Sequence, residues 1–141
     1  MRILALDYGA ERTGAAVCDP TETVVRPVGV IRKAASQAGM AEIAALVAAE
    51  RVGLVVVGVP VSLTGGEHGQ ARRSRAFAKS LAERLRVRVT TYDERFTTKV
   101  AATRGGSADI DARAAAVLLE DYLRARRVST ASNRLLGQLP D

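Results

Sequence analysis

The sequence predicts an α/β protein in which helices cover both faces of a five-stranded mixed sheet. Three short apolar segments follow one another closely at the N-terminus, which is typical of an antiparallel meander. Two later apolar runs alternate with segments of helical periodicity, and such crossovers make strands parallel. The chain has 141 residues, a length that suits one domain with one sizeable core.

The predicted meander occupies the N-terminal part of the chain. Strands are expected over 2–8 (RILALDY), 13–18 (TGAAVC) and 23–31 (TVVRPVGVI), where apolar and β-branched residues dominate. Gly9 ends the first strand in a turn, and Asp19 with Pro20 forms the next turn. Because these connections are short, each strand is expected to run antiparallel to the one before it.

Helices and strands alternate in the rest of the chain. The expected elements are a helix capped by Ser36 and running to about residue 51, a buried strand over 54–59, a Gly-rich loop over 60–69, a helix over 71–86, a strand over 87–92, a short helix near 98–103 and a last helix over 110–126. We predict one domain over 1–127 and an irregular tail over 128–141. This order matches the ribonuclease H-like architecture, and the pattern alone leaves other three-layer α/β folds open.

Basic residues are concentrated in the second half of the chain. The sequence has 21 Lys and Arg against 15 Asp and Glu, a formal net charge of +6. Residues 1–70 carry 6 basic and 7 acidic side chains (6 − 7 = −1), whereas residues 71–141 carry 15 and 8 (15 − 8 = +7). This asymmetry favours a surface that binds a polyanion. A codon bias toward Arg is the alternative, since Arg outnumbers Lys 18 to 3.

Several protein classes are excluded by composition. Cys18 has no partner for an intrachain disulfide, which fits a reducing compartment. No apolar run is long enough to span a bilayer. The N-terminal segment contains Asp7 within its apolar stretch and has no small-residue cleavage site, so we do not expect a signal peptide. A cytoplasmic protein that does not contact membranes is expected.

Four acidic residues stand where solvated surface charges are not expected. Asp7 ends an apolar strand, Asp93 and Glu94 directly follow the fifth strand, and Asp111 shares a helical face with apolar side chains. The proposed sheet would bring these groups to one edge. Buried carboxylates need hydrogen bonds, protons or cations, so a cluster of them predicts a cation site.

The donor chemistry of these side chains selects the metal. Carboxylate oxygens without His or thiolate suit Mg²⁺ or Mn²⁺, and two such ions can activate water and stabilise the leaving oxygen of a phosphodiester. Structural roles are the alternative for each residue. Asp7 could cap its turn, and Asp93 could pair with Arg95. Either Asp109 or Asp111 could cap the N-terminus of the last helix.

Candidate nucleic-acid contacts lie around these acids and along the predicted helix over 71–86. Gly9 and Gly14 would let a phosphate backbone approach closely, although a turn and a strand explain both glycines structurally. The basic candidates are solvated charges in the alternative interpretation; they are Arg12, Arg72, Arg75, Lys79 and Arg95.

Four motifs resemble the RuvX/YqgF family and fall in its order over nearly the whole domain. They are LALDYGAERTGAA (4–16), VVGVP with the following Gly-rich loop (56–69), DERFTTKVAA (93–102) and DARAAAVLLEDYL (111–123). The resemblance implies a ribonuclease H-like nuclease that either processes the 5′ end of pre-16S rRNA or resolves Holliday junctions. It also implies Asp7, Glu94 and Asp111 as catalytic residues and metal ligands, with Asp93 as a fourth acid of lower priority.

The leading hypothesis is a metal-dependent nuclease on structured nucleic acid, and we favour rRNA processing over junction cleavage. The partner is then precursor rRNA or branched DNA, with the ribosome as a further candidate, and the protein a monomer or weak homodimer. A catalytically idle nucleic-acid-binding module is a second class. An actin-like sugar kinase is a third, suggested by the phosphate-loop-like sequence around Gly9 and Gly14, but such enzymes need two such domains.

Overall fold

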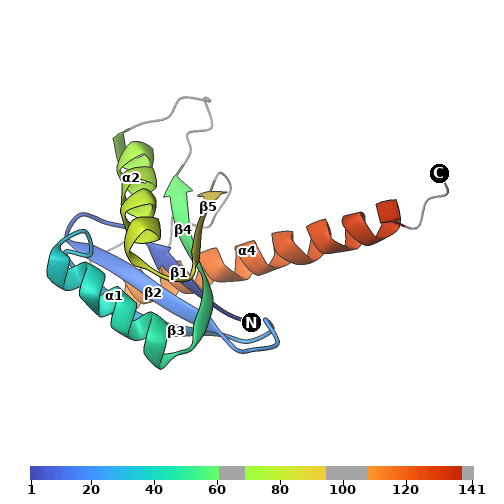
Figure 1. Cartoon of the computed structure of the whole chain (residues 1–141), viewed down its shortest axis with the longest axis horizontal. Helices are drawn as coiled ribbons and strands as arrows, with labels where there is room; N and C mark the ends of the chain where they lie inside the picture. The colour runs from blue at the N-terminus through green and yellow to red at the C-terminus, as the bar shows by residue number, and fades with distance from the viewer. Residues whose placement is uncertain (61–68, 95–107, 138–141) are drawn as a thin grey trace.

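The computed structural model describes residues 1–60, 69–94 and 108–137, which form a sheet with helices on both faces (Figure 1). The strands are β1 (Arg2–Asp7), β2 (Arg12–Cys18), β3 (Val25–Arg32), β4 (Val52–Pro60) and β5 (Arg88–Glu94). The helices are α1 (Gln37–Ala49), α2 (Gly69–Arg84) and α4 (Ala108–Gly137).

The five strands lie in the order β3-β2-β1-β4-β5. β1 with β2 and β2 with β3 form antiparallel pairs, so the predicted meander is confirmed. β4 runs parallel to both β1 and β5, as the crossover connections predict. The mixed sheet of the predicted fold class is therefore confirmed, with β1 at its centre between β2 and β4.

Strand alternation divides the core into two layers. On β1, Leu4 and Leu6 pack with α1 and α2, whereas Ile3 and Ala5 face the core beneath α4. α1 begins at the N-cap Ser36, whose hydroxyl accepts a hydrogen bond from the Gly39 N–H at 3.0 Å. Figure 1 shows α1 and α2 on one side of the sheet and α4 on the other.

The first turn of α4 rests directly on the backbone of β2 at Gly14. A Cβ atom added to Gly14 would lie 1.9 Å from the carbonyl oxygen of Asp111. Gly14 is also the antiparallel partner of Asp7 at the end of β1. The α4 backbone therefore fills the space at Gly14 that we predicted for a phosphate, and this contact places Asp111 beside the end of β1.

Three sequence-based expectations need correction. α4 continues to Gly137, so the predicted irregular tail from residue 128 is helical over most of its length. No Gly or Pro interrupts residues 108–136, and the Thr130 hydroxyl donates to the Arg126 carbonyl at 2.9 Å within the helix. β5 includes Asp93 and Glu94, which were expected to follow it. α2 begins earlier than predicted, at Gly69.

Two other expectations fall on parts of the chain that the structure does not describe. They are the short helix near 98–103 and the interior of the Gly-rich loop, residues 61–68. Among the described residues, no helix is both long and apolar enough to cross a membrane.

We predict that Gly14→Ala destabilises the protein by about 3 kcal/mol, because the new methyl group would collide with helix backbone that has no freedom to rotate away. Gly53→Ala is the matched control. Its Cβ would come close only to the flexible Met1 side chain, at 2.6 Å, with the Arg2 carbonyl oxygen at 3.9 Å, and its cost should be below about 1 kcal/mol. Urea unfolding of both variants measures the difference, and equal losses would contradict the close α4–β2 contact.

Candidate active site

Asp7, Glu94 and Asp111 are brought to the same face of the sheet by three different elements. Asp7 ends β1 and alternates with Ile3 and Ala5, so it lies on the side that α4 covers. Glu94 ends β5 and alternates with Tyr92, which packs against the same layer of core. Asp111 lies in the first turn of α4. We call these three residues the acidic edge.

The Glu94 side chain lies over Gly58 of the neighbouring strand. A Cβ atom added to Gly58 would stand 2.3 Å from Glu94 Oε2 and 2.9 Å from a methyl carbon of Leu118 on α4. Glu94 is only 6% exposed, which is unusual for a carboxylate. The missing side chain at Gly58 thus makes the room in which Glu94 is buried.

The pKa of Tyr92 is affected by burial and by the negative charge of Glu94. Burial raises the pKa of the Tyr92 phenol, and the charges of Asp121 and Glu94 raise it further. The Tyr92 ring packs edge-on against Tyr122 of α4, with 5.6 Å between ring centroids. The ring contact attaches the end of β5 to α4.

Asp111 forms an ion pair with Arg12, the first residue of β2. Arg12 Nε lies 3.1 Å from Asp111 Oδ2, and the two side chains are 32% and 22% exposed. Asp111 Oδ2 itself is buried and accepts no hydrogen bond of good geometry from the described residues. The sequence predicted Arg12 as a phosphate contact, and its pairing with Asp111 was not foreseen.

Asp93 does not join the acidic edge. As the strand neighbour of Glu94 it points to the opposite face, where its carboxylate pairs with Arg75 of α2 at 3.2 Å. The sequence expected Asp93 to follow the strand, and this is why the alternation of the two acids was missed. Asp93, the predicted fourth acid, therefore pairs with Arg75, which was predicted to contact a phosphate.

The remaining candidate contacts are distributed over two elements. Arg72 and Lys79 are exposed on α2, on the same side of that helix as Arg75. Gly9 lies in the β1–β2 turn, where its N–H lies 3.3 Å from the Thr13 hydroxyl and an added Cβ would meet the Arg12 carbonyl at 2.5 Å. Arg95 lies outside the described residues.

The acidic edge has the donor chemistry of a Mg²⁺ or Mn²⁺ site, since all its side-chain donors are carboxylate oxygens. The buried Asp111 Oδ2, without a hydrogen bond of good geometry, is the kind of atom that a cation would satisfy. Within the described residues, however, no three acidic, His or Cys side chains stand close enough to hold one metal ion together. The cation next to Asp111 is the Arg12 guanidinium.

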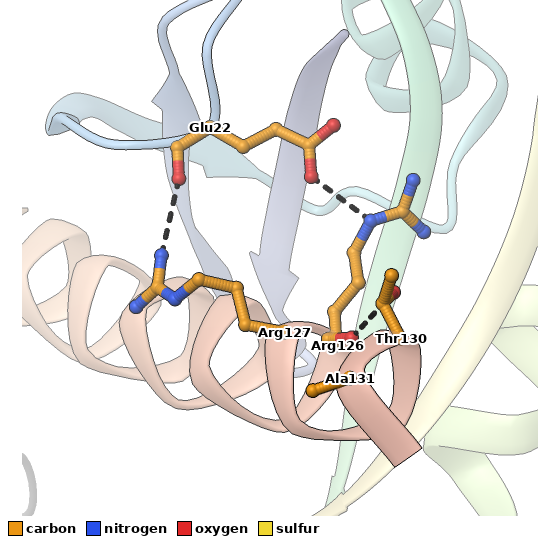
Figure 2. Close-up of a pocket in the computed structure, with 5 residues that line it drawn as sticks. All are labelled: Glu22, Arg126, Arg127, Thr130 and Ala131. Atoms are coloured by element: carbon orange, nitrogen blue, oxygen red, sulfur yellow. Dashed lines mark hydrogen bonds and ion pairs between the residues drawn. The ribbon is translucent and has the colours of Figure 1, made fainter. Parts of the chain in front are cut away.

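A polar hollow lies away from the acidic edge, near the other end of the sheet. It has a volume of about 520 Å³ and is lined by Glu22, Arg126, Arg127, Thr130 and Ala131 (Figure 2). Glu22 accepts from Arg126 Nε at 2.9 Å, and its backbone carbonyl accepts from Arg127 at 3.4 Å. Burial disfavours the Arg126 charge, but the Glu22 contact outweighs this and raises the pKa of Arg126. The contacts of Glu22 with Arg126 and Arg127 attach α4 to the β2–β3 turn.

Comparison with known proteins identifies the family. A sequence model of the RuvX family, which is described as Holliday junction resolvase, matches residues 1–125. The chain belongs to the RuvX family. Membership of this family makes the chain a nuclease, a hydrolase of nucleic-acid ester bonds.

Two RuvX-family relatives bear the name "Putative pre-16S rRNA nuclease". The protein from Anaeromyxobacter sp. (strain Fw109-5) is 41% identical over 135 residues, which cover 89% of this chain and 98% of that protein. The protein from Thermobifida fusca (strain YX) is 42% identical over 141 residues, with 88% and 87% covered. The chain thus spans nearly the whole length of these relatives.

Solved structures share the fold of this RuvX-family chain. Thermus thermophilus RuvC in complex with a Holliday junction substrate superposes with a TM-score of 0.57, covering 90% of this chain and 96% of that chain at 17% identity. A second T. thermophilus RuvC structure gives the same TM-score of 0.57. These likenesses show a common ribonuclease H-like fold, as the order of elements predicted.

We expect Gly58→Ala to lower nuclease turnover by about a hundredfold, because the added methyl group would push the Glu94 carboxylate out of its position. Cleavage of a nucleic-acid substrate under single-turnover conditions measures this effect. Gly53→Ala on the same strand is the control and should retain turnover, since it touches only the Met1 side chain. Undiminished turnover in a folded Gly58→Ala protein would show that Glu94 is not part of the active site.

Proposed function

We propose that this RuvX-family nuclease cuts phosphodiester bonds of precursor 16S rRNA in a reaction that depends on Mg²⁺ or Mn²⁺. The observation that carries the proposal is the convergence of Asp7, Glu94 and Asp111 on one face and one edge of the sheet from distant parts of the sequence. Partly or fully buried carboxylates gathered in this way repel one another, and a divalent cation would relieve that repulsion.

In the proposed mechanism, rotation of their side chains brings the three carboxylates of the acidic edge, which do not form a three-ligand group among the described residues, onto one metal ion. When bound there, a divalent cation would supply an activated water and would stabilise the leaving oxygen. The chain contributes rigid placement: Asp7 is fixed by pairing with Gly14, Glu94 by burial over Gly58, and Asp111 by the close contact of α4 with β2. The positive end of the α4 dipole also favours the charge of Asp111 in its first turn.

Substrate binding is assigned to the basic surface of α2. Arg72, Arg75 and Lys79 are exposed there, and the contact of Arg75 with Asp93 places this surface next to the end of β5. Glu94, the next residue of that strand, faces the other side of the sheet. A polynucleotide that passes around this edge would therefore contact the α2 side chains with its phosphates and present one phosphodiester to the acids.

The names of the relatives support RNA as the substrate, and the family description supports a second candidate, the Holliday junction. A four-way junction has two-fold symmetry, so its resolution calls for two copies of the site in a dimer. We propose a monomer or weak homodimer that acts on precursor rRNA in the cytoplasm, at or near the assembling ribosome. Native mass measurement combined with cleavage of both substrates distinguishes the two candidates.

We predict that Asp7→Asn lowers cleavage of precursor 16S rRNA by more than about a hundredfold. Replacing a residue that only supports a metal ligand typically lowers metal affinity or activity 10–100-fold, and replacing the ligand itself should lower it further. Binding of the RNA should survive, because the α2 surface is unchanged. Chelation of divalent ions should stop the wild-type reaction, Mg²⁺ or Mn²⁺ should restore it, and Ca²⁺ should support little cleavage.

Asp93→Asn is the matched control for this experiment. It removes the same charge from the same end of the sheet but on the opposite face, beside Arg75. Its turnover should stay close to that of the wild type. Full cleavage by Asp7→Asn, or wild-type cleavage that survives exhaustive chelation, would refute the proposed metal mechanism.

A second prediction concerns the salt dependence of RNA binding. If about four phosphates are neutralised, log affinity should fall with log salt concentration at a slope near −3 to −4. Replacing Arg72, Arg75 and Lys79 with Gln should reduce the steepness of that slope by about 2 to 3, since each lost phosphate contact removes 0.7–0.9. Filter binding or fluorescence anisotropy over a salt series measures both slopes.

The control for this series removes three charges elsewhere in the domain. Arg26, Arg124 and Arg127 are exposed and lie away from the acidic edge, on β3 and the later part of α4. Replacing them with Gln lowers the net charge equally. If both triple variants change the slope by the same amount, binding depends on net charge and not on the α2 surface.

A further inference from the structure

The ion pair between Arg12 and Asp111 puts a fixed cation at the acidic edge. Arg12 lies on the α4 side of β2, because it alternates with Gly14 and Ala16, and the latter belongs to the core beneath α4. Its Nε atom lies 3.1 Å from Asp111 Oδ2. Asp111 thus has a positively charged partner within the protein itself.

The surroundings of Arg12 favour this partner over others. Its cross-strand neighbour in the β2–β3 register is Arg32, and like charges placed directly opposite each other are destabilising. Arg12 is therefore repelled from β3 and attracted toward α4. Arg32 is exposed and forms no ion pair with the acidic residues of the described ranges, so the two arginines differ in their contact with the acidic edge.

Arg12 is also able to leave Asp111. Its side chain is 32% exposed and lies at the start of β2, directly after the β1–β2 turn, so it can rotate into solvent without any change in the sheet. The Asp111 backbone packs directly on Gly14, so it cannot shift toward Arg12 when Arg12 moves away. The same Oδ2 atom can thus exchange a guanidinium for a metal ion.

We propose that Arg12 is the resident cation of the metal-free acidic edge, and that a divalent ion displaces it from Asp111 and frees it to bind a substrate phosphate. This inference rests on the proposed function. In the metal-free protein Arg12 thus occupies one of the donor oxygens that a metal ion would need. The exchange makes Arg12 a positioning residue that couples metal binding to substrate binding.

The first test measures metal affinity without nucleic acid. Calorimetric titration with Ca²⁺ or Mn²⁺ should show that Arg12→Gln binds the ion about fivefold more tightly than the wild type, the fold-change that a partly exposed ion pair is worth. Arg32→Gln removes the same charge one strand further out and should change the affinity less than about twofold. Unchanged or weaker affinity in Arg12→Gln, or no metal binding by either protein, overturns the exchange.

The second test measures nucleic-acid affinity with and without metal. In chelator, wild type and Arg12→Gln should bind precursor RNA equally, because Arg12 is occupied by Asp111. In Ca²⁺, which supports little cleavage, the wild type should bind several-fold more tightly than the variant. An equal loss under both conditions, or no loss under either, contradicts the release of Arg12 by metal.

The outcomes of these tests are separate from the test of the proposed function. Both are equilibrium binding measurements, so they report on Arg12 whether or not cleavage requires Asp7. Circular dichroism melting of Arg12→Gln and Arg32→Gln verifies that both variants fold. If Asp7→Asn cleaves normally while Arg12→Gln binds metal more tightly, the exchange stands and the catalytic assignment fails.

Discussion

The contact between the first turn of α4 and Gly14 is the constraint on which the rest of the site depends. The helix backbone comes so close to β2 that no side chain fits between them. Gly14 pairs with Asp7, so the same residue fixes the distance of Asp111 from the end of β1. Because backbone atoms make this contact, the distance between the backbones of Asp7 and Asp111 does not depend on the packing of side chains between them.

A glycine also positions Glu94 on this face, at the ends of β4 and β5. Gly58 leaves open the position that a side chain would fill, and the Glu94 carboxylate lies there almost completely buried. Two glycines on the strands that flank β1 thus make room, Gly14 for a helix and Gly58 for a carboxylate. The charge gathered in this way is offset by Arg12, and in the proposed reaction by a divalent ion.

Much of this arrangement was predictable from the sequence. Short turns and apolar runs predicted the strand order and directions, and helical periodicity placed Asp111 on the buried face of its helix, where Ala115 and Leu118 are fully buried. The role of Gly14 was misassigned because the depth at which α4 packs is a tertiary property. The ion pair of Arg12 with Asp111 joins residues 12 and 111 and required that packing to be known.

Local pattern also misplaced the ends of two elements. β5 extends through Glu94 because parallel pairing with β4 continues to Pro60, although Asp and Glu have low strand propensity. α4 extends beyond the sheet, past the point where an apolar stripe ends, because nothing in its sequence stops the helix before Gly137 (Figure 1). Strand pairing outweighed the composition in β5, and the absence of helix-breaking residues did so in α4.

The central claim is that Asp7, Glu94 and Asp111 form one cation site from which Arg12 is displaced. X-ray diffraction from crystals soaked in Mn²⁺, recorded at the manganese absorption edge, tests this directly. We expect an anomalous peak bounded by the three carboxylates, with Arg12 turned away from its 3.1 Å contact with Asp111. Manganese bound only elsewhere, or bound among the acids with the Arg12–Asp111 pair intact, would contradict the claim.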